Sequence, residues 1–378
     1  MKTAFNVFAL LLLVGCSNTT VIREKPAVLP DLDPMVSLSP VWYLQPQGAM
    51  AVENRYIKLA ISKDSVFSAD KIGNVRSVGI RTGHIRWETD VNAFIAGGIG
   101  YSDGLIFVGT RDGEVIAIKS ETGNVIWRVN VSSEVLTPPK SSQGVVIVRT
   151  IDGKLAGLDV DTGRHLWVYE GSVPTLTLRG VSEPIIFEEK VIAGFSNGKL
   201  VSVSLHEGKI LWETVVSVPE GRSELERLVD VDANPVRFKD TIYAAAYHGR
   251  VVAVNSLSGN VIWSRNISSY AGLVVNNKHL YVSDEESNVY ALDRESGEIL
   301  WKQDKLHGRK ITVPELVDEY LVVGDYEGYL HLISQNEGHI VGRVRVDDHG
   351  IQVGPVASNE LLYVKGNSGS LTALSVKD

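Results

Sequence analysis

Short runs of alternating apolar and polar residues follow one another along most of the chain, separated by turns rich in glycine, aspartate and serine. In one such run, Val115 and Ala117 are expected to point to one side and Ile116 and Ile118 to the other. A period of two is typical of strands, because successive side chains of a strand point to opposite faces of its sheet. The pattern therefore predicts an all-β protein.

The runs belong to a longer repeat, which one copy shows in full: Gly113-Glu-Val, an alternating stretch, then Thr122-Gly123-Asn-Val-Ile-Trp127. The copies begin at residues 73, 113, 153, 198, 249, 287, 328 and 369, in steps of 40, 40, 45, 51, 38, 41 and 41. A period of about 40 residues is that of one four-stranded propeller blade. The sequence therefore predicts an eight-bladed β-propeller.

Tryptophan marks the end of the repeat, and one ring per blade is expected to fill the wedge between neighbouring sheets. The seventh copy has Gly342 where tryptophan is expected, and the chain ends within the eighth copy. Near the N-terminus, Ser39-Pro-Val-Trp42-Tyr43-Leu44 is a strand without a blade of its own, so we predict that it closes the last blade and removes its open edge. The predicted structural tryptophans are Trp42, Trp87, Trp127, Trp167, Trp212, Trp263 and Trp301.

The N-terminus has the features of a secreted lipoprotein. An apolar run too short to span a bilayer ends at Cys16, the only cysteine, and Leu13-Val14-Gly15-Cys16 resembles the lipobox of bacterial lipoproteins. We expect a signal peptide at 1–15, a lipidated Cys16 with a flexible tether at 16–37, and the propeller at 38–378. Fully extended, that tether would reach about 70 Å.

By the same resemblance, Ser17 in place of an aspartate after the cysteine points to the outer membrane, with the propeller on its periplasmic face. The alternative is a soluble secreted protein with an incidental cysteine. The net charge of −8 opposes a phosphate backbone, and there is no Lys/Arg-rich run, so nucleic acid is not expected as a partner.

The two longest steps are adjacent, and their extra residues follow the tryptophan strands of the third and fourth copies. Loops on a rigid scaffold often carry binding, and neighbouring blades would place these two insertions side by side. One interpretation is a partner-binding surface; the other is a structural role, in which the leucines complete a strand and the arginine pairs with an aspartate. The candidate residues are Leu176, Leu178, Arg179, Asp230 and Asp232.

No catalytic, metal-binding or cofactor-binding residues are predicted. The histidines form no H-E-x-x-H motif, and no G-x-S-x-G elbow occurs. The segment Asp230-x-Asp232-x-Asn234 imitates a calcium loop, but Pro235 stands where that loop needs glycine. The glycine-rich stretch 95–100 lacks the Lys-Ser/Thr of a phosphate loop, and we expect it to be a turn between strands.

The repeat resembles the tryptophan-docking motif of pyrroloquinoline-quinone propellers, and the whole chain resembles the BamB family of outer-membrane assembly lipoproteins. The more specific matches are Leu176-Thr-Leu178-Arg179-Gly180, Arg227-Leu228-Val-Asp230-Val-Asp232 and Val323-Gly324-Asp325-Tyr326-Glu327-Gly328-Tyr329-Leu330-His331.

The resemblance implies a non-catalytic scaffold without a cofactor that supports folding and insertion of outer-membrane β-barrels. It implies that Leu176, Leu178, Arg179, Asp230 and Asp232 contribute to a surface for the periplasmic POTRA domains of BamA, within the Bam complex. It also implies unfolded outer-membrane proteins as a second partner, bound at sheet edges.

Two alternatives remain at this point. A quinoprotein-like dehydrogenase shares the repeat, but such enzymes are usually longer and often carry a vicinal disulfide, which a chain with one cysteine cannot form. A generic envelope interaction propeller shares everything except the loop motifs.

Overall fold

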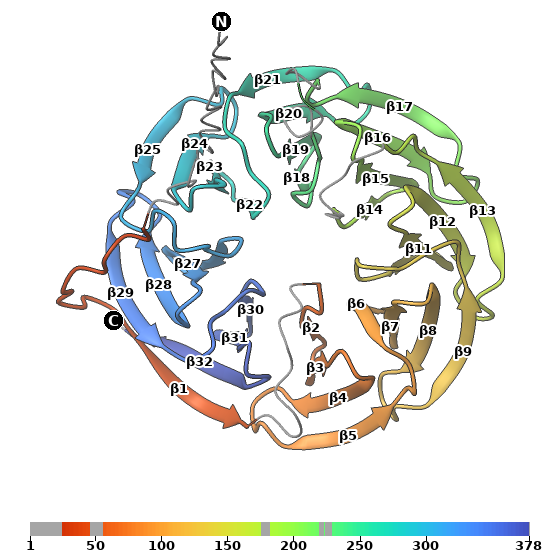
Figure 1. The fold of residues 1–378 in the computed structure, drawn as a ribbon, viewed down its shortest axis with the longest axis horizontal. Helices are drawn as coiled ribbons and strands as arrows, with labels where there is room; N and C mark the ends of the chain where they lie inside the picture. The colour runs from red at the N-terminus through yellow and green to blue at the C-terminus, as the bar shows by residue number, and fades with distance from the viewer. Residues whose placement is uncertain (1–24, 46–55, 175–181, 219–222, 224–228, 378) are drawn as a thin grey trace, which may run out of the picture.

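The computed structural model describes residues 25–45, 56–174, 182–218, 223 and 229–377. They form thirty-two strands in eight four-stranded antiparallel sheets, arranged as blades around a central axis (Figure 1). The predicted fold, an eight-bladed propeller whose last blade takes a strand from the N-terminus, is confirmed.

Within each blade the strands run from the axis outward, and we call them the inner, second, third and outer strands. Blade 1 contains β2 (Ala60–Ile61), β3 (Ser65–Ala69), β4 (Asn74–Gly79) and β5 (Ile85–Asp90). Blade 2 contains β6 (Ile95–Ser102), β7 (Leu105–Thr110), β8 (Glu114–Lys119) and β9 (Val125–Asn130). Blade 3 contains β10 (Lys140–Ser142), β11 (Val145–Arg149), β12 (Lys154–Asp159) and β13 (His165–Glu170). Blade 4 contains β14 (Ile185–Phe187), β15 (Lys190–Gly194), β16 (Lys199–Ser204) and β17 (Ile210–Val215).

The second half of the ring repeats the arrangement. Blade 5 contains β18 (Val236–Phe238), β19 (Thr241–Ala245), β20 (Val251–Asn255) and β21 (Val261–Arg265). Blade 6 contains β22 (Gly272–Val275), β23 (His279–Ser283), β24 (Val289–Asp293) and β25 (Ile299–Gln303). Blade 7 contains β26 (Glu315–Val317), β27 (Tyr320–Gly324), β28 (Tyr329–Ser334) and β29 (Ile340–Arg345). Blade 8 contains β30 (Val356–Ser358), β31 (Leu361–Lys365), β32 (Leu371–Lys377) and, outermost, β1 (Ser37–Leu44).

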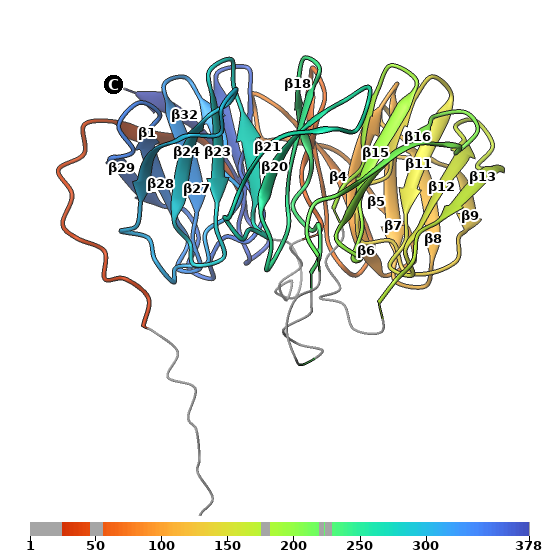
Figure 2. The same cartoon turned by 90° about the horizontal axis from the view of Figure 1, so that it is seen from above.

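The antiparallel order gives the ring two different faces. The connections from an outer strand to the next inner strand lie on one face, together with the turns between second and third strands. We call this face the loop face, and it is the lower side of Figure 2. The remaining turns lie on the opposite face, where the C-terminus also ends (Figure 2).

The hydrophobic core is distributed over the boundaries between blades. Between blades 2 and 3, for example, Phe107 and Ala117 of one sheet pack against Val146 and Val148 of the next, and all four are fully buried. Since each blade has apolar side chains on both faces, no blade can bury its surface without both neighbours.

Each tryptophan docks on the following blade. The indole of Trp87 in blade 1 lies under Gly123 of blade 2, and its N–H donates to the carbonyl of Ser120 at 2.9 Å. Gly123 has φ of +77°, and a Cβ there would stand 2.7 Å from the Trp87 ring. The turn glycine is therefore needed both for its backbone conformation and for the space it leaves.

The same contact recurs around the ring. Each indole N–H donates to a backbone carbonyl of the next blade, at 2.8 to 3.1 Å, and each ring lies against that blade's turn glycine. The pairs are Trp42 with Gly83, Trp87 with Gly123, Trp127 with Gly163, Trp167 with Gly208, Trp212 with Gly259, Trp263 with Gly297, and Trp301 with Gly338.

Closure of the ring depends on β1, which pairs with β32 along Ser37–Leu44. Trp42 of this strand is 9% exposed, lies against Tyr363 of its own blade, and donates its N–H to the Ile80 carbonyl of blade 1 at 3.0 Å. The N-terminal strand therefore supplies the last tryptophan and joins blade 8 to blade 1.

The missing tryptophan of blade 7 also has a structural reason. A Cβ at Gly342 would stand 2.4 Å from the carbonyl oxygen of Val36, where the chain enters β1. Blade 8 is formed from the two ends of the chain and has no turn before its outer strand, so no turn glycine is present to receive an indole.

One expectation was wrong. The glycine-rich stretch 95–100 is not a turn but most of β6, the inner strand of blade 2. Its glycines let the start of blade 3 approach closely: a Cβ at Gly97 would meet the backbone of Leu136, and one at Gly100 the backbone of Pro139. Spacing alone could not distinguish a flexible turn from a crowded strand.

In the part of the chain that the structure describes, no helix is long and apolar enough to cross a bilayer.

The docking contact predicts a graded effect of adding a methyl group to turn glycines. Gly123→Ala should destabilise the propeller by about 2–4 kcal/mol, because strain at positive φ adds to overpacking against Trp87. Gly104→Ala is the matched control: its φ is +80°, but nothing lies within 4 Å of the added Cβ. It should cost only about 1 kcal/mol. Equal losses in denaturant unfolding would contradict the role of the tryptophan contact.

Candidate partner-binding site

Three of the five candidate residues, Leu176, Leu178 and Arg179, lie outside the described residues, as does Cys16. Their insertion connects β13 to β14, and the other insertion connects β17 to β18. Both are outer-to-inner connections of neighbouring blades, so both begin and end on the loop face (Figures 1 and 2). The side-by-side arrangement expected from the repeat is therefore a property of the topology.

Asp230 and Asp232 lie at the end of the second insertion, and the backbone of Asp230 is fixed. Its carbonyl accepts the N–H of Tyr247 in blade 5 at 2.8 Å, and the adjacent Val231 packs where a Cβ on Gly194 of blade 4 would lie. Asp230 is only 2% exposed. The segment is thus wedged between blades 4 and 5.

Arg149 is a buried cation that the sequence analysis did not single out. It ends the otherwise apolar strand β11 in blade 3, donates from Nη1 to the carbonyl of Gly194, and lies 4.3 Å over the ring of Phe195 in blade 4. Burial lowers its pKa to about 10, against the opposing effect of Asp230 and Asp232, so it stays charged at neutral pH. A single arginine in the apolar run 145–149 was the available signal.

Asp230 is held in an unfavourable environment. Burial raises the pKa of its carboxyl, and the neighbouring Asp232 raises it further, whereas Arg149 acts in the opposite direction. Its Oδ2 is buried without a hydrogen-bond partner within the described ranges. An acidic side chain whose pKa is raised in this way by burial and by a neighbouring acid is characteristic of functional sites.

An aromatic surface adjoins this carboxylate. Tyr247 donates its N–H to the Asp230 carbonyl, and its ring stacks on that of His248 with centroids 4.0 Å apart. The ring of Tyr270 lies edge-on to the ring of Tyr247. His248 is exposed on the loop face, whereas the Asp230 side chain is buried, so the aromatic ring and not the carboxyl group is open to solvent here.

A second charged network joins the inner edges of neighbouring blades. Glu183, directly after the first insertion, forms a salt bridge with Lys58, which precedes β2 and whose N–H donates to the Gly98 carbonyl of blade 2, and another, at 3.1 Å, with Lys140 of blade 3. Its backbone N–H donates to the side chain of Asn234, which leads into blade 5, at 2.8 Å. Although burial by itself raises the pKa of Glu183, attraction by the two lysines lowers it to about 2. The ends of both insertions are thereby tied to Lys58, beside blade 2, and to blade 3.

The loop face continues into a shallow hollow beside blades 1 to 3. Its lining includes Lys71, Phe94, Arg111 and Leu136, and Phe94 is 60% exposed. A partner resting on the two insertions would therefore meet further apolar and cationic groups on the neighbouring blades.

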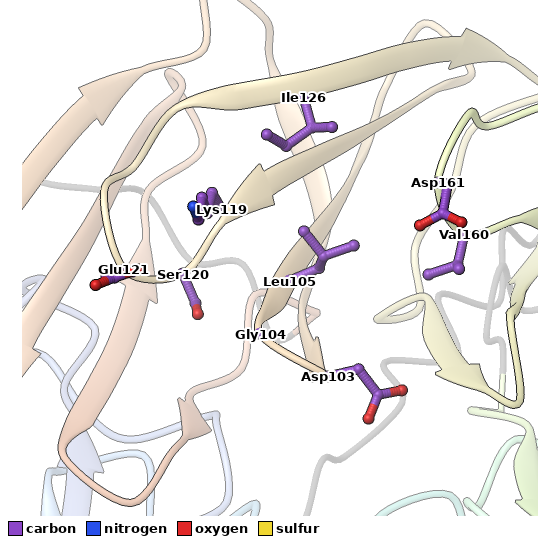
Figure 3. A pocket seen from close by; sticks show the side chains of 9 residues that line it. All are labelled: Asp103, Gly104, Leu105, Lys119, Ser120, Glu121, Ile126, Val160 and Asp161. Carbon is purple, nitrogen blue, oxygen red and sulfur yellow. The ribbon is translucent and has the colours of Figure 1, made fainter.

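Another groove lies on the opposite face, between blades 2 and 3 (Figure 3). Leu105, Ile126 and Val160 give it an apolar floor, and Asp103 and Asp161 stand at its rim (Figure 3). Since it lies away from the insertions, residues on this face can serve as controls for the loop face.

Within the described ranges, no three or more histidine, cysteine or acidic side chains are grouped so as to hold a metal ion.

The ring of docked tryptophans defines an eight-bladed propeller of the tryptophan-docking type. The family model described as "Outer membrane protein assembly factor BamB" matches residues 41–303. This chain therefore belongs to the BamB family.

Individual relatives agree. The outer membrane protein assembly factor BamB of Pseudomonas aeruginosa is 46% identical over 367 residues, covering 97% of each chain. The crystal structure of BamB from Moraxella catarrhalis superposes with a TM-score of 0.82 at 27% identity, covering 90% of this chain and all of that one. The proteins of this family are assembly factors and not enzymes.

Quinoprotein dehydrogenases share only the fold. The quinohemoprotein alcohol dehydrogenase of Comamonas testosteroni superposes with a TM-score of 0.71 at 12% identity, covering 89% of this chain and 76% of that one. The dehydrogenase alternative is therefore much weaker than membership of the BamB family.

The ion pairs of Glu183 predict a specific pH dependence. Because the folded-state pKa of Glu183 is lowered, its stabilising contribution is present above its ordinary value of 4.5 and is lost as the pH falls towards about 2. Glu183→Gln should cost about 2 kcal/mol at pH 7 and flatten the fall in Tm between pH 5 and pH 2. Glu170→Gln is a control, since that side chain is 69% exposed. An unchanged acid limb in Glu183→Gln would contradict the assignment.

Proposed function

We propose that this protein is a non-catalytic scaffold of outer-membrane β-barrel assembly that docks on the periplasmic POTRA domains of BamA through its loop face. The observation that carries the proposal is the placement of both insertions on one face of adjacent blades in a member of the BamB family. The scaffold would be held on the periplasmic side of the outer membrane by a lipid on Cys16, after removal of a signal peptide at 1–15.

The chemistry of the site supports a protein partner. In this proposal Leu176 and Leu178 are buried in the interface, Arg179 pairs with a POTRA carboxylate or organises the two loops, and Asp230 and Asp232 fix the orientation through their charge. The backbone of Asp230 is held by Tyr247 before the partner arrives, and the buried Arg149 attracts both aspartates. A preformed surface loses less conformational freedom on binding than a flexible one.

Unfolded outer-membrane proteins are the second partner that we propose. The outer strands form the edge of each blade, and the residue before the tryptophan is apolar and exposed in several of them: Ile126 is 48%, Leu211 48% and Ile262 53% exposed. An unpaired strand edge beside exposed apolar side chains suits addition of an extended chain.

Loss of BamA on charge reversal tests the site. Arg179→Glu should deplete BamA among the proteins that co-purify with the tagged chain from solubilised membranes, as measured by mass spectrometry. Arg164→Glu, an exposed arginine in a turn of the opposite face, should leave BamA unchanged. Equal recovery with both variants would remove Arg179 from the site, and absence of BamA from wild type would overturn the proposed role.

A substitution of Asp230 should affect partner binding without reducing folding stability. Asp230→Asn should leave Tm unchanged or raise it, because an acid whose pKa is raised on folding costs stability once the pH exceeds its ordinary pKa of 3.8. It should weaken binding to isolated POTRA domains about tenfold, or about 1.4 kcal/mol. The matched control is Asp325→Asn, since Asp325 is fully buried but binds Arg309 and His331, which lower its pKa against the effect of burial.

The control should lose about 3 kcal/mol of stability. The assignment fails if Asp230→Asn is destabilised as much as Asp325→Asn, or if it binds POTRA domains as wild type does.

A further inference from the structure

Residues 25–36, which precede β1, lie along the outside of blade 7, and we call them the docked segment. In Figure 2 they run from the start of β1, near the opposite face, down to the loop face. The sequence predicts this stretch to be part of a flexible tether, yet it is attached to the ring at three places.

The first attachment is at the loop face. The N–H of Ala27 donates to the carbonyl of His307 at 2.9 Å, and Nη1 of Arg309 donates to the carbonyl of Ala27 at 3.0 Å. Pro26 covers Gly308, where a Cβ would stand 3.2 Å from the Pro26 Cα. His307 to Arg309 belong to the connection from blade 6 to blade 7.

The side chain of Arg309 is held in a fixed position by its neighbours. It is 2% exposed, its Nε donates to Oδ2 of Asp325 at 2.8 Å, and it pairs with Glu327. Asp325 in turn binds Nε2 of the fully buried His331 at 2.9 Å. With Nε and Nη2 committed to carboxylates, the guanidinium presents Nη1 to Ala27 in a fixed direction. Asp325, Glu327 and His331 belong to the stretch 323–331, to which the proposed function gives no role.

The second and third attachments are along β29. Arg343 donates to the carbonyl of Pro30 at 3.0 Å, and the N–H of Met35 donates to the carbonyl of Val341 at 2.9 Å. Leu29 packs on the core between blades 6 and 7, and Val36 is 5% exposed in the core of blades 7 and 8. The segment is therefore held by both polar and apolar contacts.

We propose that the docked segment is a strap that directs the membrane anchor to the loop face, at the boundary of blades 6 and 7. This rests on the proposed lipidation of Cys16. Only residues 17–24 then remain between the anchor and the strap. At about 3.3 Å per residue they reach about 30 Å rather than the 70 Å of a free tether.

The consequence is an orientation. The anchor leaves from the same face as the two insertions, but at the boundary of blades 6 and 7, which is two and three blade boundaries around the ring from the connections that carry them (Figure 1). The membrane is thus kept close to the edge of the loop face at blades 6 and 7, while the insertions stay accessible to a partner that also rises from the membrane. A free tether would impose neither constraint.

A disulfide test addresses docking alone. In full-length Cys16→Ser protein, the pair Ala27→Cys with His307→Cys should form a disulfide on mild oxidation at least ten times faster than Ala27→Cys with Asp348→Cys. Asp348 is 82% exposed at its side chain on the next loop-face connection, on the other flank of blade 7. Equal rates would show a free segment and overturn the strap.

An energy-transfer test addresses orientation. Lipidated wild-type chain carrying a donor dye at Asp348→Cys or at Glu337→Cys is bound to vesicles of phosphatidylethanolamine and phosphatidylglycerol with an acceptor lipid. Glu337 is exposed on the opposite face of the same blade. Transfer should be at least twofold greater from position 348, and Ala27→Pro, which removes the N–H bonded to His307, should reduce that difference.

Equal transfer from both faces, or greater transfer from position 337, would overturn the orientation. If the chain does not sediment with vesicles, the lipid anchor of the proposed function fails, and the orientation with it, while the disulfide rates still decide whether the segment is docked.

Discussion

The structure depends on one contact repeated seven times: an indole of one blade inserted beneath the turn glycine of the next, with its N–H on a backbone carbonyl. No single blade can bury its apolar faces, so the ring is stable only when neighbours are joined. The eighth boundary, between blades 7 and 8, lacks the contact, and there the entering N-terminal segment takes its place, with Val36 against Gly342. The two ends of the chain are therefore part of the fold and not appendages to it.

This rigid ring explains how a surface can be built from loops. Insertions on adjacent blades start and end on one face. Buried charges join the blades beside them: Arg149 links blade 3 to blade 4, and Glu183 binds Lys58 and Lys140. Two of the buried aspartates, Asp230 and Asp325, differ in how their oxygens are paired. Asp325 is fully satisfied and holds structure, whereas Asp230 keeps an unsatisfied oxygen beside a second carboxylate. Asp230 therefore costs folding stability at the site where binding is proposed.

The sequence carried the candidate site only in part. Length differences between repeats indicated the two insertions, and the acidic pair Asp230 and Asp232 stood out within them. Arg149 and Lys58 did not stand out in the sequence. Each is a single cation whose acidic partners belong to other blades, far away in the sequence. The glycines of β6 were misread for the same reason: what crowds them is the backbone of blade 3.

By itself the sequence determined the number of blades, the strands within them and the closing role of Trp42, because a repeat with a period of about 40 residues reports a structural unit directly. Only the tertiary structure decided where charges meet across blades and how the N-terminal segment runs. Arg309 and Ala27 are separated by most of the chain, and their hydrogen bond exists only because the closed ring brings the first residues of the propeller beside its seventh blade. Local patterns encode local elements, whereas contacts between distant residues are fixed by closure of the whole ring.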